Sequence, residues 1–284
     1  MPKINQTVLM SGADYFDVVE LNSYSHDFGS VDRQKAVTEF ARIQAALQSA
    51  GVKVVKVDAP QGCQDGIFTA NWGLCRGDKV VLSSLPGPRQ AEEAYAEKVL
   101  TDLGKQVIKP PYRFSGQGDA LPCGNYLLTG SDYRTDPLMH EFLAQELGFE
   151  VISLQAVPEY DSTGQPVINQ LSGWPDSFFY DIDLAISVLR DDLIAWCPEA
   201  FMPESQEKIR ALPIEKIEVS LQEATGGFAC NLVSTGETVI MSAHAPELLA
   251  AIEARGLKII TPDITELAKG GGYIRCTSLT LDNT

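Results

Sequence analysis

"GLCRGDKVVLSSLPGPRQAEEAYAEKVLTDLGKQVIKP", residues 73–110, contains the local pattern that decides the fold. Residues 73–84 have the character of a β-hairpin, because two short apolar runs flank a turn. Residues 89–104 follow as a helix, and residues 105–110 as a further strand. The stretch therefore predicts a compact unit of two strands, one helix and one strand.

The same order of elements recurs along the chain. Further hairpins are expected at 120–131, 183–198 and 231–243, and each precedes a helix and a strand. Those helices are expected at 136–148, 207–213 and 246–256, and those strands at 149–154, 214–220 and 257–263. The chain ends supply a strand at 7–12, a helix within 30–51, a strand at 52–58 and a last strand at 272–281. About five such units at regular spacing indicate one α/β domain, residues 1–284, built as a closed array.

Composition narrows the range of partners. The chain has 284 residues and a formal net charge of −16, from 22 basic and 38 acidic residues, which argues against a nucleic-acid partner. Neither a signal-peptide pattern nor an 18-residue apolar run is present, so no membrane partner is expected. Six scattered cysteines without a CxxC pair favour reduced thiols and a cytoplasmic protein over disulfides or a zinc site. A homodimer is among the assemblies that the sequence allows.

Seven short motifs lie at the joints of these units. They are DGIFTANWG (65–73), PGPRQAEE (86–93), FSGQGDAL (114–121), SDYRTD (131–136), FYDID (179–183), FACN (228–231) and GGGYIRC (270–276). In this order the chain resembles the guanidino-group modifying superfamily, which includes dimethylarginine dimethylaminohydrolases, arginine deiminases, arginine dihydrolases and amidinotransferases. The resemblance implies a five-bladed, pseudo-symmetric α/β propeller of ββαβ units with its active site on the axis. It implies no metal and no organic cofactor.

The resemblance also implies a chemistry. A cysteine thiolate attacks the central carbon of a guanidino or amidino amino acid, an amine leaves, and water hydrolyses the covalent thiouronium adduct. The positions that match the family's motifs are Cys276 as nucleophile, Asn71, Asp119 and Asp183 as ligands of the cation, Asp65 as a further aspartate that contacts the substrate, and Arg89 and Arg134 as ligands of a substrate carboxylate. The glycines before Cys276 permit close backbone approach. The amide oxygen of Asn71 is expected to accept one hydrogen bond from the substrate guanidinium.

The family's His-x-Asp element is altered in this chain. It reads Asp181-Ile182-Asp183, and Ser115 stands where a glutamate should orient the histidine. If this segment is a strand, Asp181 and Asp183 face the same side and enter one pocket. Burial and like charge would then raise one pKa, so that a protonated Asp181 donates a proton to the leaving nitrogen and its anion later activates water. Alternatively, Asp181 stays ionised and binds a second cationic group.

The three histidines offer substitutes for the missing one. His140 lies on an expected helix face, His244 follows a strand, and His26 lies in a loop where the family often has a lid over the substrate. His26 and His244 are minor candidates for the catalytic role. A structural or solvated role is the simpler expectation for His140.

Residues 158–177, "PEYDSTGQPVINQLSGWPDS", form an expected long loop immediately before Asp181. Loops of this length are often functional, and a surface insertion is the plain alternative. Trp174 is a candidate lining residue, although ordinary packing is the simpler role. An insertion beside an altered catalytic position suggests an altered substrate.

The leading interpretation is a hydrolase of the guanidino C–N bond that uses Cys276 and Asp181 and gives citrulline-type or ornithine-type products. Two alternatives remain from the residues alone. One is a binding protein that has lost turnover together with the His–Glu pair, and the other is an amidinotransferase.

Overall fold

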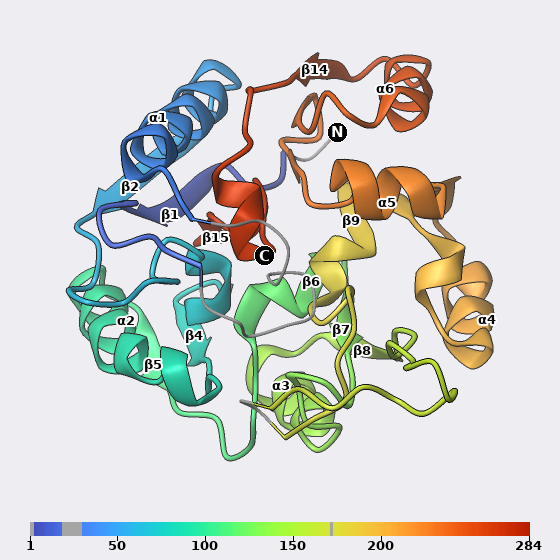
Figure 1. The fold of residues 1–284 in the computed structure, drawn as a ribbon, viewed down its shortest axis with the longest axis horizontal. Helices are drawn as coiled ribbons and strands as arrows, with labels where there is room; N and C mark the ends of the chain where they lie inside the picture. Colours follow the sequence, from blue (N-terminus) through green and yellow to red (C-terminus); the bar gives the residue numbers. More distant parts are fainter. Residues whose placement is uncertain (1–2, 19–29, 171–172) are drawn as a thin grey trace.

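The computed structural model describes residues 3–18, 30–170 and 173–284, and in these residues five three-stranded sheets surround a central axis (Figure 1). The sheets are β15-β1-β2, β3-β4-β5, β6-β7-β8, β11-β10-β9 and β12-β13-β14. The longer helices lie on the outside of the ring. The expected α/β propeller with five blades is confirmed.

The strands and helices have the following bounds. The strands are β1 Thr7–Ser11, β2 Lys53–Val57, β3 Gly73–Arg76, β4 Lys79–Leu82, β5 Gln106–Ile108, β6 Ala120–Cys123, β7 Tyr126–Gly130, β8 Glu150–Leu154, β9 Ile186–Arg190, β10 Leu193–Trp196, β11 Glu215–Glu218, β12 Val233–Ser234, β13 Thr238–Ile240, β14 Lys258–Ile260 and β15 Leu279–Thr280. The α-helices are α1 Arg33–Ser49, α2 Ala91–Asp102, α3 Met139–Leu147, α4 Pro203–Ala211, α5 Leu221–Gly227 and α6 Pro246–Glu253. Short 3₁₀ turns at the inner ends of the blades include η2 Thr69–Trp72, η4 Gly116–Gly118, η5 Ile182–Leu184 and η7 Leu267–Gly270.

Each blade repeats one topology. An antiparallel pair comes first, and the third strand pairs in parallel after the chain has crossed over through a helix. A parallel pair requires such a crossover, whereas an antiparallel pair needs only a tight turn. The first blade closes the ring, because β15 pairs antiparallel with β1 while β1 pairs parallel with β2. The chain ends therefore share one blade, as the repeat pattern predicts.

Helix α1 illustrates why these segments fold as the pattern predicts. The Asp32 side chain accepts a hydrogen bond from the Lys35 N–H and caps the first turn. Its buried apolar side chains recur at helical spacing, and they include Phe40, Ile43 and Leu47.

Two predictions about local structure were wrong. The last strand was expected over 272–281, but only Leu279–Thr280 is a strand, and the segment before it is a series of turns. Helix α5 was not expected, because residues 221–227 contain two glycines and a threonine that weaken the helical signal. Ser220 caps it by accepting from the Glu223 N–H.

Residues 158–170 and 173–177 are folded, contrary to the expected long loop. Isolated bridges join Tyr160 to Pro166 and Ile168 to Pro175, so the chain doubles back twice. Backbone hydrogen bonds tie Asp176 to both Glu159 and Val167. We call these residues the insertion hairpin. It lies over the same side of the ring as α3 and β8 (Figure 1).

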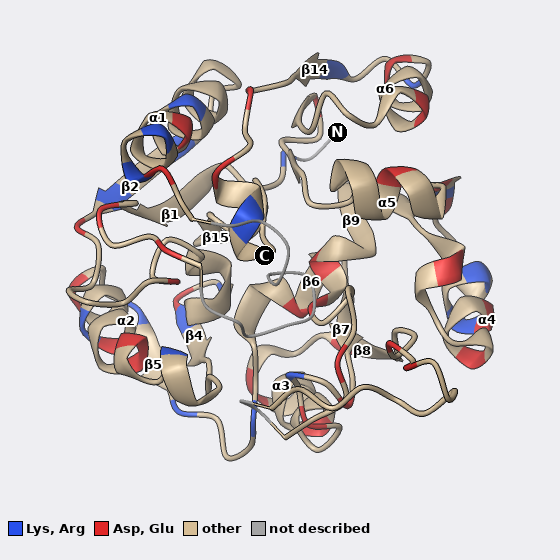
Figure 2. Ribbon diagram, viewed as in Figure 1, with Lys and Arg blue, Asp and Glu red and all other residues tan. Residues whose placement is uncertain are grey.

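Charged residues concentrate on the outer helices, while additional acidic segments lie at the axis beside β6 (Figure 2). Within the described ranges, no helix combines the length and apolar character needed to cross a membrane.

Candidate active site

Cys276 lies near the axis in a turn between η7 and β15. Its position depends on Gly272, because a Cβ there would come within 2.7 Å of the Phe68 ring and 3.0 Å of the Cys276 Cβ. The Ala70 N–H donates to the Cys276 carbonyl and ties this turn to η2. The glycines therefore serve close packing around a turn.

The Cys276 thiol has two polar neighbours. Asn231 Nδ2 lies 3.1 Å from Sγ, and Asp183 Oδ2 lies 3.2 Å from it. Asn231 Oδ1 also accepts from the backbone N–H of Cys276 and of Tyr273. Burial, followed by the adjacent Asp183 charge, raises the pKa of the Cys276 thiol well above its ordinary value. A cation bound here would favour the thiolate.

Asp181 directly precedes η5 and Asp183 lies within it, so neither residue is in a strand, which corrects the geometry expected for this element. Both side chains are nevertheless fully buried. Asp119 joins them by accepting a hydrogen bond from the Ile182 N–H at 3.0 Å. A Cβ on Gly130 would clash with the Asp119 carboxylate, so glycine is needed there. The turn thus brings three carboxylates together at the axis.

This carboxylate cluster, Asp119, Asp181 and Asp183, has unused acceptor capacity. Each residue has one buried carboxylate oxygen without a hydrogen-bond partner among the described residues: Asp119 Oδ2, Asp181 Oδ1 and Asp183 Oδ1. Burial and then the Asp181 charge raise the pKa of Asp183 to about 8 and the pKa of Asp119 well above its ordinary value. Buried acceptors of this kind suit a planar cation with several N–H groups.

Asn71 connects the cluster to a buried ion pair. Its Nδ2 donates to Asp181 Oδ2 at 2.8 Å and to the Oγ and carbonyl of Ser115. Its Oδ1 accepts from Arg89 at 2.8 Å. Gly118 makes room, because a Cβ there would meet Asn71 Nδ2 at 2.5 Å and Asp181 Oδ2 at 2.8 Å. Arg89 already donates to the Asn71 oxygen, so the expected hydrogen bond from a substrate to this oxygen stays a prediction.

Arg89 is the second residue whose surroundings differ from the expectation. Its guanidinium forms a bidentate pair with Glu92, with both N–O distances at 2.8 Å, and its remaining donors reach Asn71 and the carbonyls of Asp65 and Phe68. Burial opposes the charged form, but Glu92 outweighs burial and raises the pKa of Arg89. The side chain is 3% exposed. These contacts position Asn71 and engage all three guanidinium nitrogens of Arg89 within the protein.

Arg134 lies at the outer edge of the carboxylate cluster. Its guanidinium stacks 3.8 Å above the Tyr180 ring, and its NH1 is 3.6 Å from Asp181 Oδ2. The side chain is 11% exposed and borders a small cavity. Arg134 therefore keeps the position expected of a rim arginine.

Asp65 is buried near Arg89. Burial raises the pKa of its carboxyl to about 6, and the Arg89 charge opposes this shift. Its carbonyl accepts from Arg89, so the DGIFTAN segment and Arg89 support each other. Among the described residues, the Asp65 carbonyl thus links this residue to Arg89, and no hydrogen bond joins Asp65 directly to the carboxylate cluster.

The histidines do not replace the missing imidazole in the described part of the chain. His140 Nε2 contacts the Gly130 carbonyl at 2.9 Å, and burial lowers the pKa of the ring. His244 is exposed before α6. His26 lies outside the described residues.

Sequence reasoning missed three residues that organise this site. Asn231 holds the Cys276 thiol and backbone, Tyr180 donates its hydroxyl to the Gly271 carbonyl at 2.7 Å, and Glu92 anchors Arg89. Asn231 was visible in the FACN motif, but without a role. Glu92 was visible as an acid three residues after Arg89, a spacing at which helical side chains meet.

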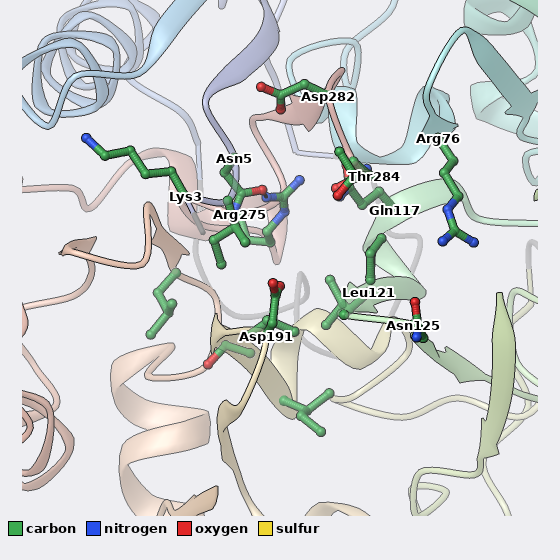
Figure 3. A pocket seen from close by; sticks show the side chains of 18 of the residues that line it. Lys3, Asn5, Arg76, Gln117, Leu121, Asn125, Asp191, Arg275, Asp282 and Thr284 are labelled. Carbon is green, nitrogen blue, oxygen red and sulfur yellow. Dashed lines mark hydrogen bonds between the residues drawn. The ribbon is translucent and has the colours of Figure 1, made fainter. Parts of the chain in front are cut away.

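A larger cavity of about 250 Å³ lies apart from the carboxylate cluster (Figure 3). Its lining includes Arg275 and Cys230, the residues immediately before Cys276 and Asn231. Asp191 and Arg275 project into its centre (Figure 3). None of the three cluster aspartates lines it, so the reactive groups belong to a different part of the axis.

Comparison with known proteins identifies the family. The family model described as N,N dimethylarginine dimethylhydrolase, eukaryotic, matches residues 20–281. The N(G),N(G)-dimethylarginine dimethylaminohydrolase of Mycobacterium tuberculosis is 29% identical over 98% of this chain and 86% of its own length. The bifunctional arginine dihydrolase/ornithine cyclodeaminase AgrE of Nostoc sp. is 30% identical over 95% of this chain but only 37% of its own length.

Solved structures of similar proteins have the same fold. The N-terminal domain of ArgZ, a cyanobacterial arginine dihydrolase, has been solved as a cysteine-to-serine variant bound to substrate. It superposes with a TM-score of 0.87 at 27% identity and covers 98% of both chains. A dimethylarginine dimethylaminohydrolase from Pseudomonas aeruginosa, complexed with citrulline, gives a TM-score of 0.72 at 19% identity over 96% of this chain and 98% of its own, and supports the fold alone. The chain therefore belongs to the N,N-dimethylarginine dimethylhydrolase family, whose enzymes hydrolyse a guanidino C–N bond.

Proposed function

We propose that this protein hydrolyses the guanidino C–N bond of an arginine-like amino acid through a covalent adduct on Cys276. One observation carries the proposal: three buried carboxylate oxygens without partners among the described residues lie in the cluster that contacts the Cys276 thiol. A guanidinium supplies the N–H donors that these oxygens lack, and its charge favours both the carboxylates and the thiolate.

The first half of the reaction forms the adduct. The bound guanidinium favours the ionised form of Asp183, and the thiol proton then passes from Cys276 to this carboxylate, whose Oδ2 lies 3.2 Å from Sγ. The thiolate then attacks the guanidinium carbon, and a C–S bond forms. The C–N bond to the leaving nitrogen breaks as Asp181 supplies a proton, and ammonia or an amine departs from a thiouronium adduct.

The second half restores the enzyme. Asp181, now a carboxylate, takes a proton from the attacking water as a C–O bond forms at the same carbon. The C–S bond breaks, and the hydroxyl proton of the collapsing adduct passes to the leaving Cys276 sulfur. Asp183 gives the proton that it had accepted to the departed amine, which restores the enzyme and leaves a neutral ureido amino acid. A second round at the ureido carbon, with loss of ammonia and carbon dioxide, would give an ornithine-type product, as the names of the dihydrolase relatives suggest.

The contacts around Asp181 support its role in proton transfer. Oδ2 accepts from Asn71 and faces Arg134, and both neighbours are donors. A proton on Asp181 would therefore reside on Oδ1, the oxygen without a described partner. Arg89 fixes the Asn71 amide in this orientation, so we assign Arg89 a positioning role and leave the substrate carboxylate to Arg134.

Product analysis tests the proposal. Mass spectrometry of reactions with L-arginine, methylated arginines and other guanidino acids should give a ureido or amino product with the native protein and none with Cys276→Ser. If a guanidino ligand binds but neither product nor adduct forms, the binding-protein alternative replaces this proposal. Transfer of the amidino group to an added amine would instead indicate an amidinotransferase.

We also propose that the protein acts in the cytoplasm. All six cysteines are free thiols, which suits a reducing compartment. A homodimer stays a prediction of the sequence.

A further inference from the structure

The FACN motif, residues 228–231, ends at a buried amide beside the candidate nucleophile. The backbone N–H of Asn231 donates to the Phe228 carbonyl at 3.0 Å, which closes a tight turn directly after α5. The Phe228 ring stacks on the Tyr273 ring, with centroids 5.3 Å apart and planes at 6°. The motif therefore packs against the turn that carries Cys276, and Asn231 is fully buried there.

Two backbone N–H groups fix the orientation of the Asn231 amide. Its Oδ1 accepts from the Tyr273 N–H at 3.1 Å and from the Cys276 N–H at 3.2 Å. An amide nitrogen carries only donors, so only the oxygen fits this position. The amide nitrogen Nδ2 therefore points the other way, where it lies 3.1 Å from Cys276 Sγ and 3.3 Å from the Asp183 carbonyl. The sulfur thus receives a hydrogen bond from Asn231.

This orientation also decides where the thiol hydrogen lies. Nδ2 cannot accept it, whereas Asp183 Oδ2, at 3.2 Å from Sγ, can. Asp183 and Asn231 therefore have opposite roles at the sulfur: one accepts the proton and the other donates to the atom that loses it. A hydrogen bond to an ionised acceptor is stronger than one to a neutral acceptor, so the Asn231 amide favours the thiolate over the thiol.

The surroundings of the sulfur make such a donor important. Burial, followed by the Asp183 charge, raises the pKa of the Cys276 thiol well above its ordinary value. A thiolate formed in this place has lost its water and needs protein donors instead. The amide of Asn231 is a side-chain donor already aimed at it in the described part of the chain.

We propose that Asn231 is a further catalytic residue, which donates a hydrogen bond to the Cys276 thiolate while its carbonyl oxygen holds the turn that presents the sulfur. This role rests on the proposed function, because it presumes a nucleophilic thiolate. Asp183 removes the proton from the sulfur, and Asn231 stabilises the charge that remains until the C–S bond forms. The FACN motif thereby gains a role that its sequence alone does not reveal.

Two variants separate the two halves of this role. Asn231→Asp keeps an oxygen for the two backbone N–H groups but loses the amide donor, whereas Asn231→Ala loses both without adding a charge. We expect each variant to lower the rate at which iodoacetamide alkylates Cys276 at a fixed pH by about tenfold or more, the size of a lost hydrogen bond to a charged group. Peptide mapping by mass spectrometry measures this rate, and it reports the thiolate because the thiolate is the form that reacts.

Turnover of L-arginine gives a second readout. The kcat should fall by about tenfold or more in both variants while KM changes less, because the lost bond is to the nucleophile. Alkylation of Cys63, a half-buried thiol, is the internal control in the same sample, and the Tm shows that each variant is folded. The matched control variant is Asn125→Asp, the same change at an exposed position between β6 and β7, which should keep both rates within about twofold.

The pattern of losses decides the proposal. Loss in Asn231→Ala alone would make Asn231 a structural support of the turn, and loss in Asn231→Asp alone would be an effect of the added charge. Either result overturns the donor role while the proposed hydrolysis stands. If the native protein forms no product, the hydrolysis is wrong, and the alkylation rates still decide whether Asn231 donates to the thiolate.

Discussion

Asn71 donates its Nδ2 to Asp181 Oδ2 across 2.8 Å, while the oxygen of the same amide accepts from Arg89. This relationship makes Oδ2 an acceptor and leaves Oδ1 of Asp181 as the oxygen that can exchange a proton with a substrate. Asp181 therefore has one oxygen held by the protein and one oxygen without a hydrogen-bond partner among the described residues. This geometry supports the proton transfer that we propose for Asp181.

Asp181→Asn tests that role. We expect kcat to fall by about 10²–10⁴-fold, because an amide cannot carry the proton between the leaving nitrogen and water. The loss in kcat should exceed the loss in L-arginine affinity, since Asp119 and Asp183 still contact the cation. Steady-state kinetics together with calorimetry in Cys276→Ser would separate the two quantities. A variant that loses affinity in proportion to activity would make Asp181 a ligand of the cation only.

Breaking the Arg89–Glu92 pair should affect both stability and chemistry. Arg89→Gln leaves Glu92 uncompensated at 1% exposure, so the free energy of unfolding should fall by about 3–5 kcal/mol. Arg255→Gln, at the more exposed pair with Glu215, is the matched control and should cost about 0–1 kcal/mol. Denaturant titration measures both changes.

The positioning role of Arg89 has its own readout. In Arg89→Gln the Asn71 amide is no longer held by Arg89, so the pH dependence of kcat should shift. If Arg89 were only structural, the protein that remains folded would keep the native pH dependence of kcat. A direct ligand of the substrate carboxylate would instead show as a selective rise in KM for L-arginine relative to agmatine.

Ligand affinity should rise with pH. The pKa of Asp183 is raised to about 8, so most of this group carries a proton at neutral pH in the free protein. A bound guanidinium favours the carboxylate, and binding should therefore release protons below about pH 8. Calorimetry of L-arginine with Cys276→Ser, in two buffers of different ionisation enthalpy, counts the protons. Proton uptake, or affinity that falls from about pH 6 to about pH 8, would contradict this assignment.

The contribution of Asp183 to the stability of the ligand-free protein should fall as pH rises, whereas ligand affinity should increase. Because the folded-state pKa of Asp183 exceeds its ordinary value of 3.8, its contribution to stability is present at low pH and is lost as pH rises through about 8. The Tm of the native protein minus the Tm of Asp183→Asn should therefore be smallest at high pH. A difference that is constant from about pH 5 to about pH 8 would exclude an unusual pKa.

The blade pattern was predictable because it depends on local features. Hairpins such as 120–131 and capped helices such as α1 carry their periodicity and end signals in the sequence. The turns before Cys276 and the insertion hairpin carry no such signals. Packing against Phe68 determines the turns, and paired backbone groups determine the insertion hairpin. Tertiary contacts of this kind leave little periodic signal in the residues themselves.

The candidate site likewise has features that the sequence predicted and features that depend on tertiary contacts. Motif positions predicted that Asp119, Asp181, Asp183 and Cys276 would be functional, and the fold gathers them at the axis. The sequence did not predict the partner of each polar atom, so Arg89 was expected to hold substrate and the Asn71 oxygen to be free. Glu92 holds Arg89, and through Arg89 the Asn71 oxygen, by an ion pair whose strength depends on burial that only the fold supplies.

The most direct test of the central claim is the mass of the intact protein after rapid acid quenching during turnover of L-arginine, with peptide mapping of any adduct. The account predicts a covalent adduct on the peptide that contains Cys276, and its absence in Cys276→Ser together with product formation. Turnover by Cys276→Ser, or product formed by the native protein without an adduct on this peptide, would contradict a nucleophilic Cys276.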